Sequence, residues 1–397
     1  YGVNGNISGL GDFTAQGNYS VGSKYLGKSA IILNALMNQD LSWEESKTFD
    51  IGADVTLFNN RLSIIFDYFK RKTDNLLTER YLPHSTGFES VKTNLGKLQN
   101  TGIELEVSSH ILSPSCPVQW DLGFNISRVK NKILELPDNG IDRNRIGGEY
   151  IWNEKLHDYV WAGGLQEGGR MGDLFAYKMV GIYATDEDAQ NPSEPTDMIM
   201  TTTDKKKYGG DVKWLDADKN GIIDSRDRVY MGNIYPDWTG GINTSLSYKG
   251  ISLYCRLDFS LGHTIYNYAK NFLDYNWQGD NNITKDMIKR SWKKQGDIAE
   301  LPRFYWYGDR GQQNTIRGNS VYYEDGDYLA IRELTLSYSL PKNIVKKMCL
   351  SGLRFSVSGN NLHYFTKYKG LNPEEGGKDN GRYAVPRNVI FSANVSF

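Results

Sequence analysis

The last ten residues, Asn388-Val389-Ile390-Phe391-Ser392-Ala393-Asn394-Val395-Ser396-Phe397, show the pattern that decides the fold. Apolar residues occupy positions 389, 391, 393, 395 and 397, and polar residues fill the alternate positions except at Ile390. Such period-two alternation predicts a strand with one apolar and one polar face. One strand of this kind fits the end of a soluble β-sandwich or the closing strand of a membrane β-barrel, because alternation in a single strand is a weak signal.

The same alternation recurs upstream in runs that are long for a globular sheet. The runs 43–58 and 61–76 are separated by Asn59-Asn60, which predicts a hairpin. Further runs lie at 99–112, 118–133, 172–185, 236–248, 251–265, 327–340, 352–366 and 385–397. Globular strands usually have about five or six residues, whereas a strand that crosses a bilayer needs about 9–11. The lengths therefore favour an all-β fold, a transmembrane antiparallel β-barrel.

The lengths of the connections favour the barrel as well. Short connections at 59–60, 113–117, 249–250 and 341–351 nearly alternate with long ones at 77–98, 186–235, 266–326 and 367–384. Outer-membrane barrels have short periplasmic turns and long extracellular loops, whereas a sandwich has no reason to sort loops in this way. We therefore expect 186–235 and 266–326 to be extracellular, with a short helix within 284–292.

Regular alternation also requires strands that the pattern shows less clearly. It predicts an inward strand at about 156–167, an outward strand at 172–185, and the outer end of an outward strand at residues 1–6. The expected total is about 12 strands. The opening residues look like the middle of a longer protein, so we expect a first strand that is cut short.

Composition excludes several classes of function. The 46 basic and 47 acidic residues give no basic patch of the kind that a nucleic-acid partner requires. Mean hydropathy is −0.54, and no stretch approaches the ~20 apolar residues of a membrane helix. The three cysteines and five histidines show no disulfide, zinc or catalytic spacing. Glu104 and Glu106 fall on one face of a strand and are expected to line a polar lumen, so no enzymatic activity is predicted.

One segment, 216–227, fits the pattern of a calcium-binding EF-hand loop. The candidate ligands are Asp216, Asp218, Asn220, the backbone carbonyl of Ile222, Asp224 and Asp227, with Gly221 at the sharp turn. Asp227 stands where the usual ligand is a longer glutamate, so a structural Ca²⁺ would bind weakly, at roughly 10⁻⁴–10⁻³ M. The alternative is a turn-rich surface loop without metal, since Asp, Asn and Gly favour turns.

Aromatic residues in or near the long connections have three possible roles. They could stack on sugars, pack against a lid protein, or form the aromatic belts found at membrane interfaces. The residues in question are neighbouring tyrosines together with Trp152, Trp161, Trp277, Trp292 and Trp306. The sequence does not choose among these roles for any single residue.

Several segments together resemble a known family. They are LSWEES at 41–46, FDIGAD at 49–54, FNNRL at 58–62, DYFKRKTDNLL at 67–77, NLG at 94–96, NTGIEL at 100–105, GDLFAY at 172–177, the stretch 209–227, and YLAIRELTLSY at 328–338. In this order they resemble the C-terminal part of a SusC/RagA-type TonB-dependent outer-membrane transporter of Bacteroidetes. The resemblance spans essentially all of residues 1–397.

The resemblance implies an importer of oligomeric nutrients, either glycans or peptides, in the outer membrane of a Gram-negative cell. Such transporters are 22-stranded barrels with a plugged lumen. A SusD-like lipoprotein would cap the mouth, and TonB would act through a plug domain that has no counterpart in this sequence. The remaining wall would come from an N-terminal part of the same barrel, and lipid would surround it. The alternatives are a soluble extracellular all-β glycan-binding protein and a barrel enzyme.

Overall fold

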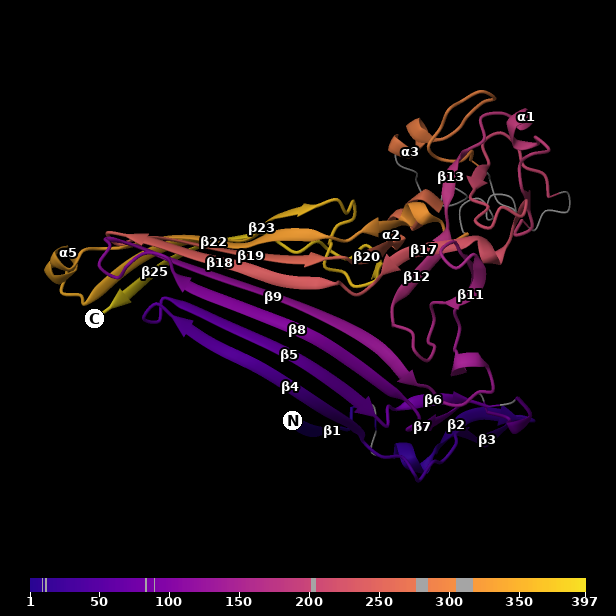
Figure 1. Ribbon diagram of the computed structural model, residues 1–397, viewed down its shortest axis with the longest axis horizontal. Helices are drawn as coiled ribbons and strands as arrows, with labels where there is room; N and C mark the ends of the chain where they lie inside the picture. The colour runs from indigo at the N-terminus through magenta and orange to yellow at the C-terminus, as the bar shows by residue number, and fades with distance from the viewer. Residues whose placement is uncertain are drawn as a thin grey trace.

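The computed structural model describes residues 1–8, 10, 13–82, 84–88, 90–200, 205–275, 285–304 and 317–397. Its main feature is one ten-stranded sheet with the order β1-β4-β5-β8-β9-β18-β19-β22-β23-β25 (Figure 1). These strands are β1 Gly2–Asn6, β4 Glu44–Leu57, β5 Leu62–Asp74, β8 Lys97–His110, β9 Val118–Glu135, β18 Trp238–Tyr248, β19 Ile251–Leu261, β22 Tyr328–Ser339, β23 Gly352–Thr366 and β25 Asn388–Ser396. Each strand pairs antiparallel with the next one in this order, as in the wall of an up-and-down barrel.

One face of this sheet, which we call the apolar face, carries apolar side chains from strand to strand. A single row of register partners runs through Val55, Ile64, Val107, Phe124, Ile242, Leu257 and Ile331. The row nearer the short turns includes Leu253, Leu336 and Val357, which are 41%, 54% and 42% exposed. A bilayer would remove this surface from water, which stabilises by about 25 cal/mol per Å² of apolar area.

The opposite, polar face carries the side chains expected to line a lumen. Glu104 and Glu106 lie opposite Ser127 and Asn125, which confirms that the two glutamates share a face. At the far end of the sheet, Arg332 sits in a β-bulge that shifts the register of β22 against β19. Its guanidinium donates to Asp258 at 2.7 Å and to the Tyr364 hydroxyl at 2.9 Å.

Short and long connections alternate along the sheet. The short ones are 58–61, 111–117, 249–250 and 340–351, and the long ones are 7–43, 75–96, 136–237, 262–327 and 367–387. The predicted hairpin is confirmed: Phe58, Asn59 and Asn60 turn the chain between β4 and β5 with φ of 53°, 54° and 65°. The outward strand expected at residues 1–6 is confirmed as β1.

Two predicted barrel strands are wrong. Residues 156–167 contain β11 (Asp158–Ala162), which pairs with β10 (Glu149–Asn153) in a hairpin separate from the main sheet. Residues 172–185 form β12 (Asp173–Tyr177) and β13 (Met179–Ile182), which pair outside the main sheet. Because β9 pairs directly with β18, the segment 136–237 is one connection and 186–235 is only part of it. The described wall therefore has ten strands rather than about 12.

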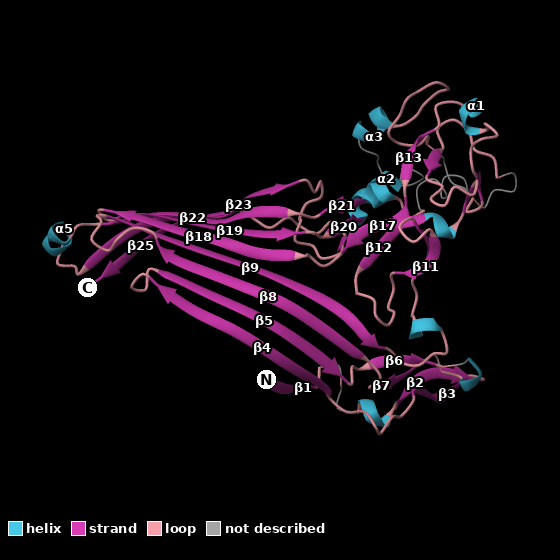
Figure 2. Cartoon of the chain, viewed as in Figure 1, coloured by secondary structure: helices cyan, strands magenta, loops and turns pink. Residues whose placement is uncertain are grey.

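The long connections contain the remaining elements, grouped at one end of the sheet (Figure 2). The strands are β2 Asn18–Tyr25, β3 Lys28–Ala35, β6 Thr78–Tyr81, β7 Ser90–Thr93, β14 Thr196–Asp197, β15 Val212–Trp214, β16 Ile222–Ile223, β17 Arg228–Asn233, β20 Thr264–Asn267, β21 Tyr323–Asp325 and β24 Lys378–Asp379. The helices are η1 Thr14–Gln16, η2 His84–Thr86, η3 Asp142–Asn144, α1 Asp186–Ala189, η4 Ser225–Asp227, α2 Tyr268–Tyr275, α3 Lys285–Arg290 and η6 Ser320–Tyr322. The exception is α5 (Lys342–Lys347), which lies in a short connection at the opposite end.

The predicted helix near 284–292 is confirmed as α3, although its expected first residue, Thr284, lies outside the described residues. None of the helices in the described ranges is long and apolar enough to cross a membrane.

A small lobe within 173–233, which we call the loop lobe, has its own apolar core. Tyr177, Val212, Trp214 and Ile223 are buried together, with Met179, Ile182 and Ile199 packed against them. This core explains the misleading alternation at 172–185, because one face of β12 and β13 is buried by the lobe rather than by a membrane. The lobe positions the acidic loop, since β16 lies within 216–227.

A buried ion pair fastens the loop lobe to a later part of the chain. Arg317 Nη2 lies 2.9 Å from Asp197 Oδ2 and 3.0 Å from Asp197 Oδ1, and the two side chains are 1% and 2% exposed. The guanidinium also lies over the rings of Trp214 and Tyr177, at 4.7 and 5.3 Å from their centroids. Asp197 belongs to β14, which pairs in parallel with β16 of the acidic loop. The ion pair therefore holds β14 in place, and β14 in turn pairs with the strand inside the acidic loop.

Candidate metal site and aromatic hairpin

The acidic loop runs from the end of β15 to the start of β17. Gly221 has φ of 81°, a left-handed conformation that glycine adopts without strain. The residues after it form β16 and then the short helix η4. Strands rather than long helices flank the loop, so it is an isolated loop and not half of an EF-hand pair.

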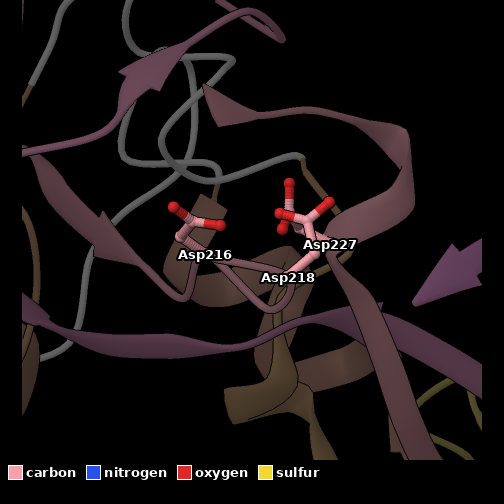
Figure 3. Close-up of side chains that lie close together, drawn as sticks. All are labelled: Asp216, Asp218 and Asp227. Atoms are coloured by element: carbon pink, nitrogen blue, oxygen red, sulfur yellow. The ribbon is translucent and has the colours of Figure 1, made fainter. Parts of the chain in front are cut away.

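Three carboxylates of this loop converge. Oxygens of Asp216, Asp218 and Asp227 lie within 4.8 Å of one another (Figure 3). Backbone amides hold two of them in place: Gly221 N donates to Asp216 at 2.8 Å, and Ala217 N and Asp224 N donate to the two oxygens of Asp227 at 2.8 and 2.7 Å. Carboxylate oxygens are the ligands that Ca²⁺ prefers, so this set fits a hard divalent cation.

Burial and like charge act together on Asp227. Its side chain is fully buried, and the loss of hydration is the largest cause that raises its pKa from 3.8 to about 6. The charges of Asp218 and Asp216 raise that pKa further, whereas the hydrogen bonds from Asp224 and Ala217 lower it. Repulsion between the three ionised carboxylates therefore destabilises the cluster, and a bound cation would relieve this repulsion.

The other three predicted ligands, Asp224, Asn220 and Ile222, make contacts within the loop. Asp224 is turned toward Arg226, whose Nε donates to it at 2.8 Å. The hydrogen bonds from the Arg226 side chain lower the pKa of that carboxyl. The Asn220 side-chain oxygen accepts a hydrogen bond from Ile222 N at 2.7 Å, and Ile222 itself belongs to β16. Among the acidic residues, the structure thus brings together positions 1, 3 and 12 of the predicted loop and turns position 9 toward Arg226. The Asn220 amide at position 5 donates to Asp218 at 2.9 Å.

An aromatic hairpin stands beside the acidic loop. On one face of the β10–β11 hairpin, Tyr150 lies opposite Trp161 and Trp152 lies opposite Tyr159, with ring centroids 5.4 and 5.3 Å apart. Tyr150 and Trp161 are 43% and 37% exposed. The Tyr159 hydroxyl donates a hydrogen bond to Asp218, which joins the hairpin to the carboxylate cluster.

A cavity of about 490 Å³ follows the β11 side of this hairpin. Aromatic rings and polar groups line it together, including Tyr150, Tyr159, Trp161, Asn153, Arg170 and Asp173. Planar rings beside groups that donate and accept hydrogen bonds suit an oligomeric ligand with alternating apolar and polar surfaces.

The sequence singled out Trp152 and Trp161 by number and the neighbouring tyrosines only as a group, without identifying Tyr150 and Tyr159. The spacing of two residues within each pair places all four rings on one face, and this spacing could have identified the hairpin. Trp292 has another role: it is buried and its indole donates to the Ala184 carbonyl at 3.0 Å. Trp277 and Trp306 lie outside the described residues.

An antiparallel sheet of long strands, with its long connections at one end, is typical of the wall of an outer-membrane β-barrel. Residues 6–362 match the family described as TonB dependent receptor-like, beta-barrel. The chain therefore belongs to this family, whose members are outer-membrane proteins. The predicted fold class, membrane location and family resemblance are confirmed.

Several relatives share this organisation. TonB-dependent receptor P3 of Formosa agariphila is 32% identical over 383 residues, covering 93% of this chain and 36% of that protein. TonB-dependent receptor SusC of Bacteroides thetaiotaomicron is 26% identical, covering 90% of this chain and 32% of that protein. A solved structure of the RagAB peptide transporter superposes with a TM-score of 0.75 at 22% identity, covering 100% of this chain and 40% of that one.

Two facts follow from these comparisons. The chain spans between 32% and 40% of the length of these relatives. The relatives are receptors and transporters rather than enzymes, in agreement with the prediction of no enzymatic activity.

Proposed function

We propose that this chain forms part of the wall and mouth of a TonB-dependent outer-membrane importer of oligomeric nutrients, glycans or peptides. The observation that carries the proposal is the ten-stranded antiparallel wall with all long connections at one end. In this proposal the long connections face the outside of the cell, where ligand arrives. The short turns face the periplasm, where TonB would act on the plug domain of the full-length receptor.

The proposed partner at the mouth is a SusD-like surface lipoprotein. It is supported by the family and by the similarity to SusC and to RagAB. The chain itself would contribute the wall, the loop lobe and the aromatic hairpin, and no covalent step. The exposed rings of Tyr150 and Trp161 would hold ligand by stacking while polar residues of the adjoining cavity donate and accept hydrogen bonds.

A deletion strain tests this function directly. We expect loss of the full-length receptor to abolish growth on one class of oligomeric glycan or peptide while growth on the corresponding monomers is unchanged. Loss of TonB should give the same phenotype, and pull-down of the tagged receptor should recover a surface lipoprotein. Unaltered growth on every oligomer that the wild type uses would reject the proposal.

The aromatic hairpin gives a sharper test. The double substitution Tyr150→Ala with Trp161→Ala should weaken ligand binding to the full-length receptor about tenfold or more, because stacking on a ring contributes roughly 1 kcal/mol or more per contact. Isothermal titration with the growth-supporting oligomer measures this. The matched control is Trp120→Ala with Tyr248→Ala, a Trp and a Tyr that are 40% and 44% exposed at the other end of the wall. Equal weakening by both double variants would contradict the assignment.

We propose in addition that Asp216, Asp218 and Asp227 bind a structural Ca²⁺. The convergence of the three carboxylates and the raised pKa of Asp227 support this. The ion would stiffen the acidic loop and, through the hydrogen bond from Tyr159 to Asp218, hold the aromatic hairpin in place. The expected affinity stays in the roughly 10⁻⁴–10⁻³ M range of extracellular modules.

Calcium binding should depend on pH in a defined direction. Because the pKa of Asp227 is about 6, a proton competes with the ion below that pH, and affinity should fall about tenfold between pH 7 and pH 5. Without calcium, the raised pKa of Asp227 makes the folded loop less stable at higher pH. Ionising Asp227 is unfavourable in the folded loop, so the loop loses stability as pH rises from about 4 through 6. Calorimetric titration at both pH values measures the first effect, and thermal unfolding in chelator measures the second.

Substitutions of single aspartates distinguish the proposed calcium ligands from the neighbouring Asp224. Asp216→Asn and Asp227→Asn should abolish measurable binding, whereas Asp224→Asn should weaken it less, because Asp224 is held by Arg226. The absence of any calcium binding up to millimolar concentration at pH 7 would refute the site and leave a turn-rich loop closed by hydrogen bonds.

A further inference from the structure

The short-turn end of the wall has an unusual charge distribution. The four short connections, 58–61, 111–117, 249–250 and 340–351, contain five basic residues and no acidic residue. The basic residues are Arg61, Lys249, Lys342, Lys346 and Lys347. By contrast, the long connection 136–237 holds nineteen acidic and twelve basic residues. The whole chain is nearly neutral, so the positive charge is concentrated at one end.

The lysines at this end differ from the arginine in how the fold holds them. Arg61 is held by the carbonyls of His110 and Ile111. The four lysines are exposed, and none of them makes an ion pair within the described residues. Three of them belong to α5, which packs against the wall through the buried Val345 and leaves Ile344 and Met348 45% and 52% exposed. No carboxylate of the described residues therefore neutralises the charge of these four lysines.

An exposed aromatic row lies directly next to these lysines. Tyr248, Ile251, Tyr338 and Phe355 are consecutive register partners on the apolar face and are 42–50% exposed. Lys249 lies over the Tyr248 ring, with its ammonium 5.1 Å from the centroid. The amide of Ser339 donates to the Gly250 carbonyl at 2.8 Å, which brings the Lys249 turn to the strand end that leads into α5.

An aromatic row of this kind marks the boundary between hydrocarbon and lipid headgroups. Lysines that follow it immediately reach the height of the lipid phosphates, where their apolar stems stay along the wall. Ile344 and Met348 give α5 an apolar surface for the same boundary. This arrangement fits a lipid partner better than an acidic protein, because the cations are continuous with the membrane-facing surface.

We propose that Lys249 and the α5 lysines Lys342, Lys346 and Lys347 form a binding site for anionic glycerophospholipid headgroups. The site holds lipids of the leaflet next to the short turns and fixes the height and tilt of the wall at that leaflet. It is independent of the transported substrate, and it requires only that the apolar face lies in a bilayer.

Native mass spectrometry of the full-length receptor, titrated with dioleoyl-phosphatidylglycerol, tests this site. We expect K342Q/K346Q/K347Q to lower the apparent affinity for this lipid about tenfold or more, since each lysine near an anionic lipid surface strengthens the electrostatic attraction to it. The charge-keeping variant K342R/K346R/K347R should retain wild-type binding. The matched control K289Q/K293Q/K294Q removes three exposed lysines at the opposite end and should change nothing.

Three results would overturn the proposal. The first is equal phosphatidylglycerol binding by wild type and the α5 glutamine variant. The second is equal affinity of the wild type for zwitterionic phosphatidylethanolamine, which would show that only apolar contacts matter. The third is a lysine-dependent loss of a co-purified acidic protein while lipid binding is unchanged. If the triple variant does not fold, K249Q in comparison with K249R gives the same test with one charge.

Discussion

Replacing Asp197 with asparagine is expected to destabilise the loop lobe by about 3–5 kcal/mol, because it leaves the buried guanidinium of Arg317 without a counter-charge. Both side chains are almost fully buried, and the Arg317 Nε and Nη1 atoms have no hydrogen-bond partner among the described residues. Hydrogen exchange of the full-length receptor measures the effect locally. Exchange should accelerate in peptides from β13 to β16 and stay unchanged in β22.

Two comparison variants make this prediction specific. Asp325→Asn removes one partner of an exposed pair, in which Lys367 lies 4.0 Å away, and should change stability by less than about 1 kcal/mol. The combined change Asp197→Leu with Arg317→Met removes both charges and should recover much of the loss, as replacement of a buried pair by apolar residues often does. Unchanged exchange in Asp197→Asn would show that the pair does not support the lobe.

Placing arginine at Leu336 should destabilise the barrel in a bilayer by about 1–2 kcal/mol, because a charge on the lipid-facing side between the midplane and the interface is costly. Leu336 is 54% exposed on the apolar face and lies between Leu253 and Val357 on the neighbouring strands. Denaturant unfolding of the full-length receptor from lipid vesicles measures the difference.

The matched control for this substitution is the adjacent residue. Thr335 lies on the polar face, where its hydroxyl forms hydrogen bonds with Glu333 and with Ser358, each at 2.8 Å. Thr335→Arg places the same charge one residue away on the lumen side and should cost less than half as much. Equal destabilisation by arginine at both positions would mean that one face of β22 does not contact lipid while the other contacts water.

The barrel wall could be predicted because its strands are long and alternate strictly. The same rule failed at 172–185, where alternation arises because the loop lobe buries one face of β12 and β13. Period two reports a half-buried strand and does not say what buries it. Length separates the two cases, since β12 and β13 have 5 and 4 residues whereas β9 has 18.

The acidic loop was predictable from local spacing, but the roles within it were not. Asp224 has the ligand spacing, yet Arg226 two residues later captures it, and such competition is decided by local rotamers. The ion pair of Arg317 with Asp197 joins residues 120 positions apart, so no local sequence pattern predicts it. The link from Tyr159 to Asp218 depends in the same way on how two loops pack.

Strand β22 is expected to cross a lipid bilayer as part of the barrel wall. Spin labels at positions 334, 335, 336, 337 and 338 of the full-length receptor in liposomes test it through collisions with oxygen and with a water-soluble nickel complex. Labels at 334 and 336 should be accessible to oxygen and shielded from nickel. The label at 338 should show this signature more weakly, because Tyr338 lies at the headgroup boundary, and labels at 335 and 337 should not show it. A uniform response along the strand, without period two, would contradict the account.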